Sequence, residues 1–320
     1  MAAPYPLKKQ LSESWLITMK SSALIGKSNK KQYIGLLYIT PWILGFLVFQ
    51  LYPFISSFLY SFTDYSLTAS PSFTGLKNYI ELFSKDEQFF NSLKVTLYYV
   101  FMSVPMKLAF ALLVAMILNI RLKYVNFFRT VYYLPSILGG SVAVAVLWRF
   151  LFLEDGLVNR ILGYVKIPPV GWLSDPGIAL FSISLLTVWQ FGSSMVLFLA
   201  GLKQIPQELY EAGRVDGASK LRMFFTLTIP LLTPIIFFNL IMQMVNAFQD
   251  FTGAFVITNG GPMKATYLYA MKLYDEGFLF FKMGYASALS WVLFIIIMAF
   301  TALTFKSSAS WTHYEDGGDF

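Results

Sequence analysis

The sequence predicts an all-α membrane protein with six transmembrane helices and both termini in the cytoplasm. Hydrophobic residues make up 57% of the 320 residues and charged residues only 13%, and the mean hydropathy is positive, which soluble globular chains rarely show. Six apolar stretches are each long enough to cross about 30 Å of hydrocarbon as a helix of roughly 20 residues. Lipid is therefore the expected solvent for most of this chain.

The expected spans are helices, because a lipid-exposed helix satisfies its own backbone hydrogen bonds and the sequence lacks the alternation of a membrane barrel. We expect the spans at residues 33–62, 93–118, 130–153, 178–202, 231–256 and 284–305. The first is too long for a signal peptide. Residues 93–305 then form the main transmembrane domain, and residues 1–32 and 306–320 form tails.

The distribution of Lys and Arg predicts the orientation in the membrane. Alternate connections carry fourteen of these residues on the side of the termini and seven on the other side, which places both termini in the cytoplasm. The net charge is +7, but the basic residues fall between the apolar stretches and form no sustained patch. We therefore expect no nucleic-acid partner. The 1–32 tail is either a short helix on the inner leaflet or a disordered segment.

Several classes of active site are excluded by residue usage. Cysteine is absent and His313 is the only histidine, so neither a disulfide framework nor a Cys/His metal site is expected. A Gly-x-Ser-x-Gly elbow and a zinc-binding histidine pair are also missing. We therefore expect no catalytic residue, no metal and no cofactor in this chain.

A polar segment of residues 203–229 separates the fourth and fifth spans on the expected cytoplasmic side. Its acidic residues come early, its basic residues come late, and Gly217 lies where two short helices would meet. Such a loop suits docking into a groove on another protein. An ordinary amphipathic connector would have a similar composition.

The residue order in this segment resembles the EAA loop of binding-protein-dependent ABC importer permeases. That loop has Glu-Ala-Ala, a few residues, Asp-Gly-Ala, and a proline at the next helix. The matching residues are Glu211, Ala212, Asp216, Gly217, Ala218, Ile229 and Pro230. Gly213 replaces the third alanine, which weakens the local helix by up to about 1 kcal/mol. The resemblance implies ATPase coupling by Glu211, Ala212, Gly213, Asp216, Gly217 and Ala218.

The resemblance extends over about residues 33–305 and is greatest to carbohydrate permeases similar to the larger membrane subunit of the maltose transporter. Residues 75–79, 128–135 and 258–262 resemble further segments of those permeases. The last of these is an outside loop in that family. The resemblance therefore implies a contact loop for the binding protein, made of Thr258, Asn259, Gly260, Gly261 and Pro262.

The same resemblance implies type I importer architecture in the bacterial cytoplasmic (inner) membrane. Its partners would be a second homologous permease, two ATP-binding subunits and an extracytoplasmic solute-binding protein that delivers a carbohydrate. ATP and Mg would bind to the partner ATPase subunits. Closure of the ATPase pair would move the helices through the 203–229 loop as a rigid-body transition.

Polar side chains inside the fifth span indicate where a substrate passes, because they are costly in a membrane unless they face a cavity or a partner. Asn239, Gln243, Asn246 and Asp250 recur at i, i+4, i+7 and i+11, along one helical face, with Gln249 beside it. Amide and carboxylate groups can hydrogen-bond to the hydroxyls of a sugar.

The fourth span adds Thr187, Gln190 and Ser194 on one face, near aromatic residues that can stack on pyranose rings. The alternative is that these polar groups bond between helices and hold the bundle together. The resemblance favours a cavity, since helices four to six supply most sugar contacts in similar permeases. The predicted substrate path comprises Trp189, Gln190, Ser194, Asn239, Gln243, Asn246, Gln249 and Asp250.

Lys107, in the middle of the second span, is a costly side chain in lipid. It pairs with Asp250 or a backbone carbonyl, or it lends positive potential to the path of an acidic sugar. Together these features predict a permease subunit of an ATP-driven importer of a di- or oligosaccharide, with an acidic oligosaccharide as a refinement. The alternative is an ion-gradient-driven secondary transporter of a polar solute, which also needs a polar site at the midplane.

Overall fold

The computed structural model describes residues 28–68, 70–120, 123–308 and 310–312. The expected surface helix of the N-terminal tail and most of the C-terminal tail lie outside these residues. The chain divides into two units, residues 1–59 and residues 60–320, which are described separately. Apart from an isolated antiparallel bridge between Thr63 and Phe73, the described elements are all helices.

In the first unit, α2 (Ser28–Phe46) continues through the π-helical turn η1 (Leu47–Leu51) into α3 (Tyr52–Tyr60). The turn widens just before Pro53, and the N–H of Tyr52 bonds to the carbonyl of Leu47, five residues back. Residues Leu37–Tyr60 are long and apolar enough to cross a membrane. The first expected span is therefore a helix.

The second unit contains long helices and short ones. The long helices are α5 (Glu87–Asn119), α6 (Val125–Ile137), α7 (Val142–Leu151), α9 (Ala179–Trp189), α10 (Gly192–Gln204), α13 (Ile229–Phe248) and α16 (Met283–Ser308). The short helices are α4 (Lys77–Ser84), α8 (Leu157–Tyr164), α11 (Gln207–Val215), α12 (Lys220–Met223), α14 (Thr252–Ile257) and α15 (Tyr269–Tyr274), with the π-helical turns η2 (Phe224–Thr228) and η3 (Asp275–Leu279).

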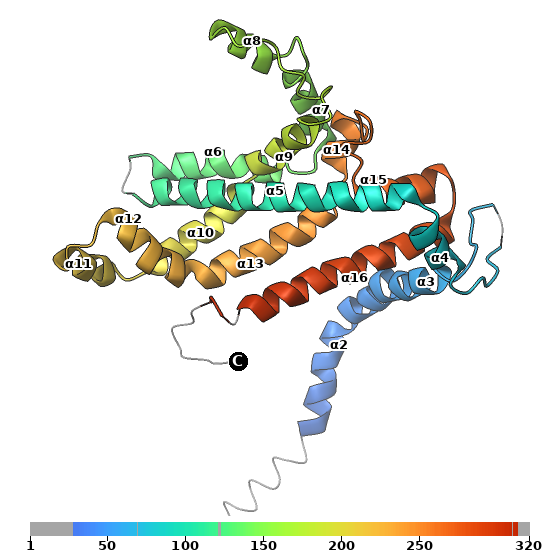
Figure 1. The fold of residues 1–320 in the computed structure, drawn as a ribbon. Coiled ribbons are helices and arrows are strands. Elements are labelled where there is room, and N and C mark those ends of the chain that lie inside the picture. Colours follow the sequence, from blue (N-terminus) through green and yellow to red (C-terminus); the bar gives the residue numbers. More distant parts are fainter. Residues whose placement is uncertain (1–27, 69, 121–122, 309, 313–320) are drawn as a thin grey trace, which may run out of the picture. The chain divides into compact units, whose positions relative to one another are not determined.

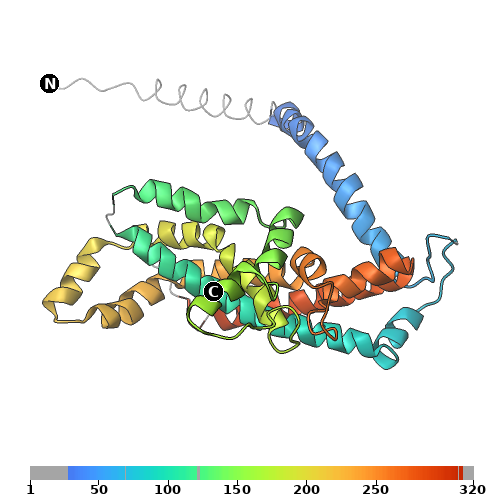
Figure 2. The same cartoon turned by 90° about the horizontal axis from the view of Figure 1, so that it is seen from above.

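Helix α5 is the central element of this unit (Figures 1 and 2), with α6, α9, α10, α13 and α15 packed against it. Its buried residues recur every three or four positions, among them Val100, Val104, Leu108, Ala111 and Ala115. At 33 residues it is about 50 Å long. The α11–α12 hairpin lies near one end of α5, and α4 and α15 lie near the other (Figure 1).

Four of the described helices can each cross a membrane alone, and the number reaches six when each of two bent pairs is one span. The expectation of one continuous helix over residues 130–153 is wrong. Helices α6 and α7 meet at 101° across residues 138–141. Gly140 has a left-handed φ of +75° there, which residues with a Cβ adopt only at a cost.

The expected fourth span is also broken, because α9 and α10 meet at 50°. A Cβ on Gly192, at the start of α10, would lie 2.5 Å from the carbonyl oxygen of Tyr132 in α6. The Ser136 hydroxyl donates to the carbonyl of Gln190 (3.1 Å) and accepts from the N–H of Ser193 (3.0 Å). The break in this span is therefore held against α6.

The fifth span begins and ends earlier than the expected range of residues 231–256. It runs without interruption from Lys220 through η2 to Phe248, and α14 is a separate helix. Asp250 lies between α13 and α14. The expectation that it continues the helical face of Asn239, Gln243 and Asn246 is therefore wrong.

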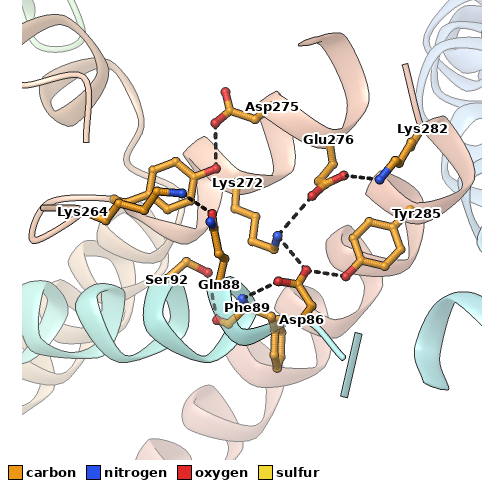
Figure 3. A network of polar contacts seen from close by, with 11 residues as sticks. Asp86, Gln88, Phe89, Ser92, Lys264, Lys272, Asp275, Glu276, Lys282 and Tyr285 are labelled. Carbon is orange, nitrogen blue, oxygen red and sulfur yellow. Dashed lines mark hydrogen bonds and ion pairs between the residues drawn. The ribbon is translucent and has the colours of Figure 1, made fainter. Parts of the chain in front are cut away.

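A cluster of four charged and polar side chains, here called the clamp, joins α15, η3 and α16 to the start of α5 (Figure 3). It consists of Asp86, Lys272, Glu276 and Tyr285. The Lys272 ammonium lies 2.7 Å from Oδ2 of Asp86 and 3.2 Å from Oε1 of Glu276. The Tyr285 hydroxyl donates to Asp86 (2.6 Å), and the other oxygen of Asp86 caps α5 by accepting from the N–H of Phe89 (3.0 Å).

Replacing Lys272 by Met should destabilise the protein, because two half-buried carboxylates would lose their cation. Lys272 is 3% exposed, and breaking a buried ion pair from one side typically costs about 3–5 kcal/mol. Lys282 is the matched control, since it contacts Glu276 at 3.6 Å with a side chain that is 59% exposed. Lys282→Met should cost less than about 1 kcal/mol. Thermal unfolding in detergent measures both, and equal losses would contradict a buried clamp.

The clamp should also weaken in acid. Burial raises the pKa of Asp86, but the hydrogen bonds from Lys272 and Tyr285 outweigh burial and hold the pKa below its usual range. Its contribution to stability is then complete above the unfolded pKa, about 4, and is lost as the pH falls through the lower folded value. The unfolding temperature of wild type should fall more steeply below about pH 4 than that of Asp86→Asn.

Gly192→Ala should also destabilise the protein, because the added methyl group meets the backbone of Tyr132, and overpacking costs about 1–3 kcal/mol. Gly163→Ala in α8 is the control, since nothing lies within 4 Å of a Cβ there. This control should be neutral or gain up to about 1 kcal/mol of stability. Thermal unfolding compares the two variants, and an unchanged Gly192→Ala would show that the break between α9 and α10 is free to move.

Candidate functional site

A cavity of about 430 Å³ lies where the helix breaks of the second unit meet α5 and the end of α13. Its walls combine one ammonium, one carboxylate, amides, hydroxyls and glycine backbone. The lining residues are Lys107, Ser136, Gly139, Gly140, Thr187, Gln190, Ser193, Gln243, Asn246, Ala247 and Asp250. The cavity is therefore polar and is built from at least four spans.

A second cavity of about 170 Å³ adjoins the first, and Gly140, Thr187, Gln190 and Asp250 line both. Gln249 lines only this smaller one. Because the shared residues come from the α6–α7 break, from α9 and its C-terminal break, and from the segment after α13, all three interruptions border one polar space. Irregular backbone at membrane depth is tolerated where it lines such a space.

A short hydrogen-bond network fixes the carboxylate in this space. The Tyr99 hydroxyl of α5 donates to Asp250 and shares a 2.6 Å hydrogen bond with the Thr187 hydroxyl of α9. The Tyr99 hydroxyl thus joins three separate segments, since it bonds both to Asp250 and to Thr187. Tyr99 is fully buried, so this network also anchors α5 to the breaks.

Lys107 lines the larger cavity from α5 and is 7% exposed. Among the residues that the structure describes, its ammonium has neither an ion pair nor a hydrogen bond. The direct contacts with Asp250 and with a backbone carbonyl that the sequence suggests are therefore not formed, although the Asp250 carboxylate in the same cavity attracts the ammonium electrostatically. The ammonium is left facing the cavity.

Only some residues of the predicted substrate path line the two cavities. Gln190, Gln243, Asn246 and Asp250 line the larger cavity and Gln249 the smaller one, as above. Trp189 lies outside both linings and packs against Trp148, with ring centroids 6.0 Å apart. Ser194 and Asn239 are fully buried away from the linings, and Asn239 donates to the carbonyl of Ile235 (3.1 Å).

Ser136, Gly139, Gly140 and Ser193 line the cavity but are missing from the predicted path. Polar spacing along straight helices could not reveal them, because they lie at or beside the breaks. The Gly139-Gly140-Ser141 run inside an apolar span was the available signal, since glycine pairs mark turns.

The loop predicted to couple to an ATPase forms a helical hairpin of α11 and α12. Helix α11 ends in a Schellman motif: the N–H of Ala218 bonds to the carbonyl of Gly213 (2.9 Å), and the N–H of Gly217 to that of Arg214 (3.1 Å). Gly217 has a φ of +74°. The Asp-Gly-Ala part of the motif is therefore the end cap of a helix, as the expected bend at Gly217 requires.

This hairpin is tied to the fifth span. The Tyr210 and Thr228 hydroxyls share a hydrogen bond of 2.9 Å between α11 and η2. A Cβ on Gly213 would lie 3.2 Å from the sulfur of Met223, so glycine lets α11 pack closely on α12. Glu211, Ala212, Asp216 and Gly217 remain exposed.

The loop predicted to contact a binding protein is internally hydrogen-bonded. It comprises Thr258, Asn259, Gly260, Gly261 and Pro262. The Thr258 and Thr266 hydroxyls share a 2.7 Å hydrogen bond, and Thr266 donates to the carbonyl of Gly261 (2.7 Å). Tyr267 beside it donates to Asp275 (2.7 Å). Burial, with this hydrogen bond, raises the pKa of the Tyr267 phenol, so the hydroxyl stays protonated and keeps donating.

Comparison with known proteins places this geometry in a family. Residues 85–308 match the family described as "Binding-protein-dependent transport system inner membrane component". The chain is 48% identical over 300 residues to the probable ABC transporter permease protein YesP of Bacillus subtilis (strain 168), covering 93% of this chain and 96% of that protein. It is 33% identical over 279 residues to the arabinooligosaccharides transport system permease protein AraP of the same organism, covering 86% and 88%.

A solved structure of a bacterial alginate ABC transporter, in complex with an alginate pentasaccharide-bound periplasmic protein, contains a chain of similar fold. The TM-score is 0.75 at 21% identity, with 88% of this chain and 96% of that chain covered. The family match runs from just before α5 to the end of α16 and includes the cavity and the α11–α12 hairpin. It confirms the resemblance drawn from the loop of residues 203–229 and the expected multi-pass location in the inner membrane. The chain therefore belongs to the binding-protein-dependent inner-membrane permeases of ABC transporters.

Proposed function

We propose that this chain forms one half of the translocation path of an ATP-driven importer of a di- or oligosaccharide. The observation that carries this proposal is the 430 Å³ cavity, in which amides and hydroxyls from α6, α9, α10 and α13 and from the α9–α10 break converge beside α5. Sugars need many hydrogen-bond partners at once, and such groups fix orientation in ligand sites. The names of AraP and of the alginate complex support an oligosaccharide.

The complete importer would contain a second homologous permease, two ATP-binding subunits and an extracytoplasmic solute-binding protein. ATP and Mg would be held by the ATP-binding subunits, and this chain would carry no catalytic residue. The family description names a binding-protein-dependent system, which supports the binding protein as a partner. The loop of residues 258–262 is the proposed contact for it, near the end of α5 opposite the α11–α12 hairpin.

The α11–α12 hairpin would couple the ATPase subunits to the path. Its exposed residues Glu211, Ala212, Asp216 and Gly217 offer a docking surface, while the Schellman cap and the bond between Tyr210 and Thr228 hold the hairpin rigid. Helix α12 continues through η2 into α13 without interruption. A displacement of the hairpin is therefore transmitted to Gln243 and Asn246 through one helix. This is rigid-body transmission through an element with two positions.

Gly217→Ala should lower ATP hydrolysis stimulated by the binding protein several-fold. A left-handed residue with a Cβ costs about 1–2 kcal/mol, which distorts the cap that presents Glu211. Gly75→Ala is the matched control, since Gly75 also has a positive φ (+62°) and open space around it but lies outside the hairpin. The assay uses this chain with its candidate partner subunits in liposomes. If no ATPase co-purifies and sugar moves with an imposed ion gradient, a secondary transporter replaces the proposal.

Asn246→Ala should reduce oligosaccharide uptake by about fivefold, the effect of losing one hydrogen bond worth about 1 kcal/mol. Gln243→Ala should behave alike, since both amides line the cavity. Ile241→Ala on the same helix is the control, because Ile241 is two positions from Gln243 and five from Asn246, which places it on the opposite face of α13. Uptake of labelled sugar into liposomes measures all three. Equal uptake by wild type and both amide variants would place the sugar elsewhere.

A further inference from the structure

Two lysines are buried among the residues that the structure describes, and they differ in whether a carboxylate contacts the ammonium. Lys272 is held in the clamp by two carboxylates, at 2.7 and 3.2 Å. Lys107 lies in the middle of a membrane-spanning helix, where a charge is most costly, and no carboxylate is bonded to it. Among the described residues, the Asp250 carboxylate, which lines the same cavity without contacting the ammonium, offsets only part of the cost of burying Lys107.

The other charged group of the cavity is already engaged. Tyr99 donates to the Asp250 carboxylate and also bonds to Thr187. Tyr99 and Lys107 are eight residues apart on α5, which is about 12 Å of helical rise. Asp250 is thus held at the turn of Tyr99, two turns from Lys107, and does not neutralise it by direct contact.

The backbone adds positive potential around the same space. Helices α7 and α10 both begin beside the cavity, where Gly140 and Ser193 line it. Neither helix has an N-cap side chain that accepts from its first N–H groups, and in α10 the Ser136 hydroxyl of α6 takes only the N–H of Ser193. Helix N-termini carry a partial positive charge and favour anions, and interrupted helices present such ends to anionic substrates in other transporters.

We propose that Lys107 binds a carboxylate of the transported sugar, so that the cavity selects oligosaccharides containing a uronic acid. This inference rests on the proposed function and names the substrate class of the same cavity. The carboxylate accepts a hydrogen bond from the Lys107 ammonium, while Gln190, Gln243 and Asn246 hydrogen-bond to hydroxyls. A neutral sugar leaves the ammonium without a directly bonded carboxylate, and that difference is the basis of selection.

The test compares a uronic acid disaccharide with its carboxyl-reduced counterpart, which is neutral but otherwise the same. The purified complete complex is used without its binding protein, so that selectivity of the binding protein does not enter. Affinity is read from the ligand-induced rise in unfolding temperature. Wild type should bind the uronate about tenfold or more tightly than the reduced sugar, the size expected for a hydrogen bond to a charged group.

Lys107→Met should lose this preference, and Lys107→Arg should retain it. Lys94→Met is the matched control, because Lys94 is exposed on the same helix over the Tyr98 ring, and it should keep the wild-type ratio. Equal binding of both sugars by wild type overturns the role of Lys107 while the sugar cavity stands, whatever the folding of the variants. If neither sugar binds to wild type, both the inference and the proposed function of the cavity fail.

Discussion

Lipid offers no hydrogen-bond partner to a polypeptide backbone, and the arrangement of this protein depends on that constraint. Long stretches such as α5 and α16 satisfy it by forming continuous helices. In the described part of the chain, the backbone departs from helix at residues 138–141 and 190–191, inside the third and fourth spans, and at residues 249–251, directly after the fifth. All three meet at one polar space, so the places where the backbone is irregular also form the candidate site.

Buried polar side chains are under the same constraint as the backbone, because burying each one is costly unless it has a hydrogen-bond partner. Tyr99, Thr187 and Asp250 satisfy one another across three segments, and the clamp satisfies Lys272 at the end of α5. These networks join helices that are far apart in sequence. Ser103, Ser194 and Asn239 each keep a buried atom without a hydrogen-bond partner, and Lys107 is a buried cation with no carboxylate bonded to it among the described residues. Because an unpaired charge is more costly to bury than an unpaired neutral group, the environment of Lys107 carries information about the ligand.

The two ends of α5 differ in how they are held. At one end, the clamp and the hydrogen-bonded loop of residues 258–262 form a fixed polar surface. At the other, the α11–α12 hairpin exposes its motif residues and continues directly into α13. One rigid helix therefore connects the proposed ATPase contact with the amides of the cavity, which is the physical requirement for coupling over such a distance.

The sequence by itself determined the helical membrane fold, the number of spans within the range observed, the family and the bend at Gly217. These follow from hydrophobic length and from residues whose backbone preference is local. Tertiary structure alone decided that the third and fourth spans are broken and that Asp250 leaves the face of Gln243. It also decided that Lys107 is unpaired while Ser194 and Asn239 lie outside the cavity. The reason is that periodicity along one helix cannot report where another helix packs or where a cavity opens.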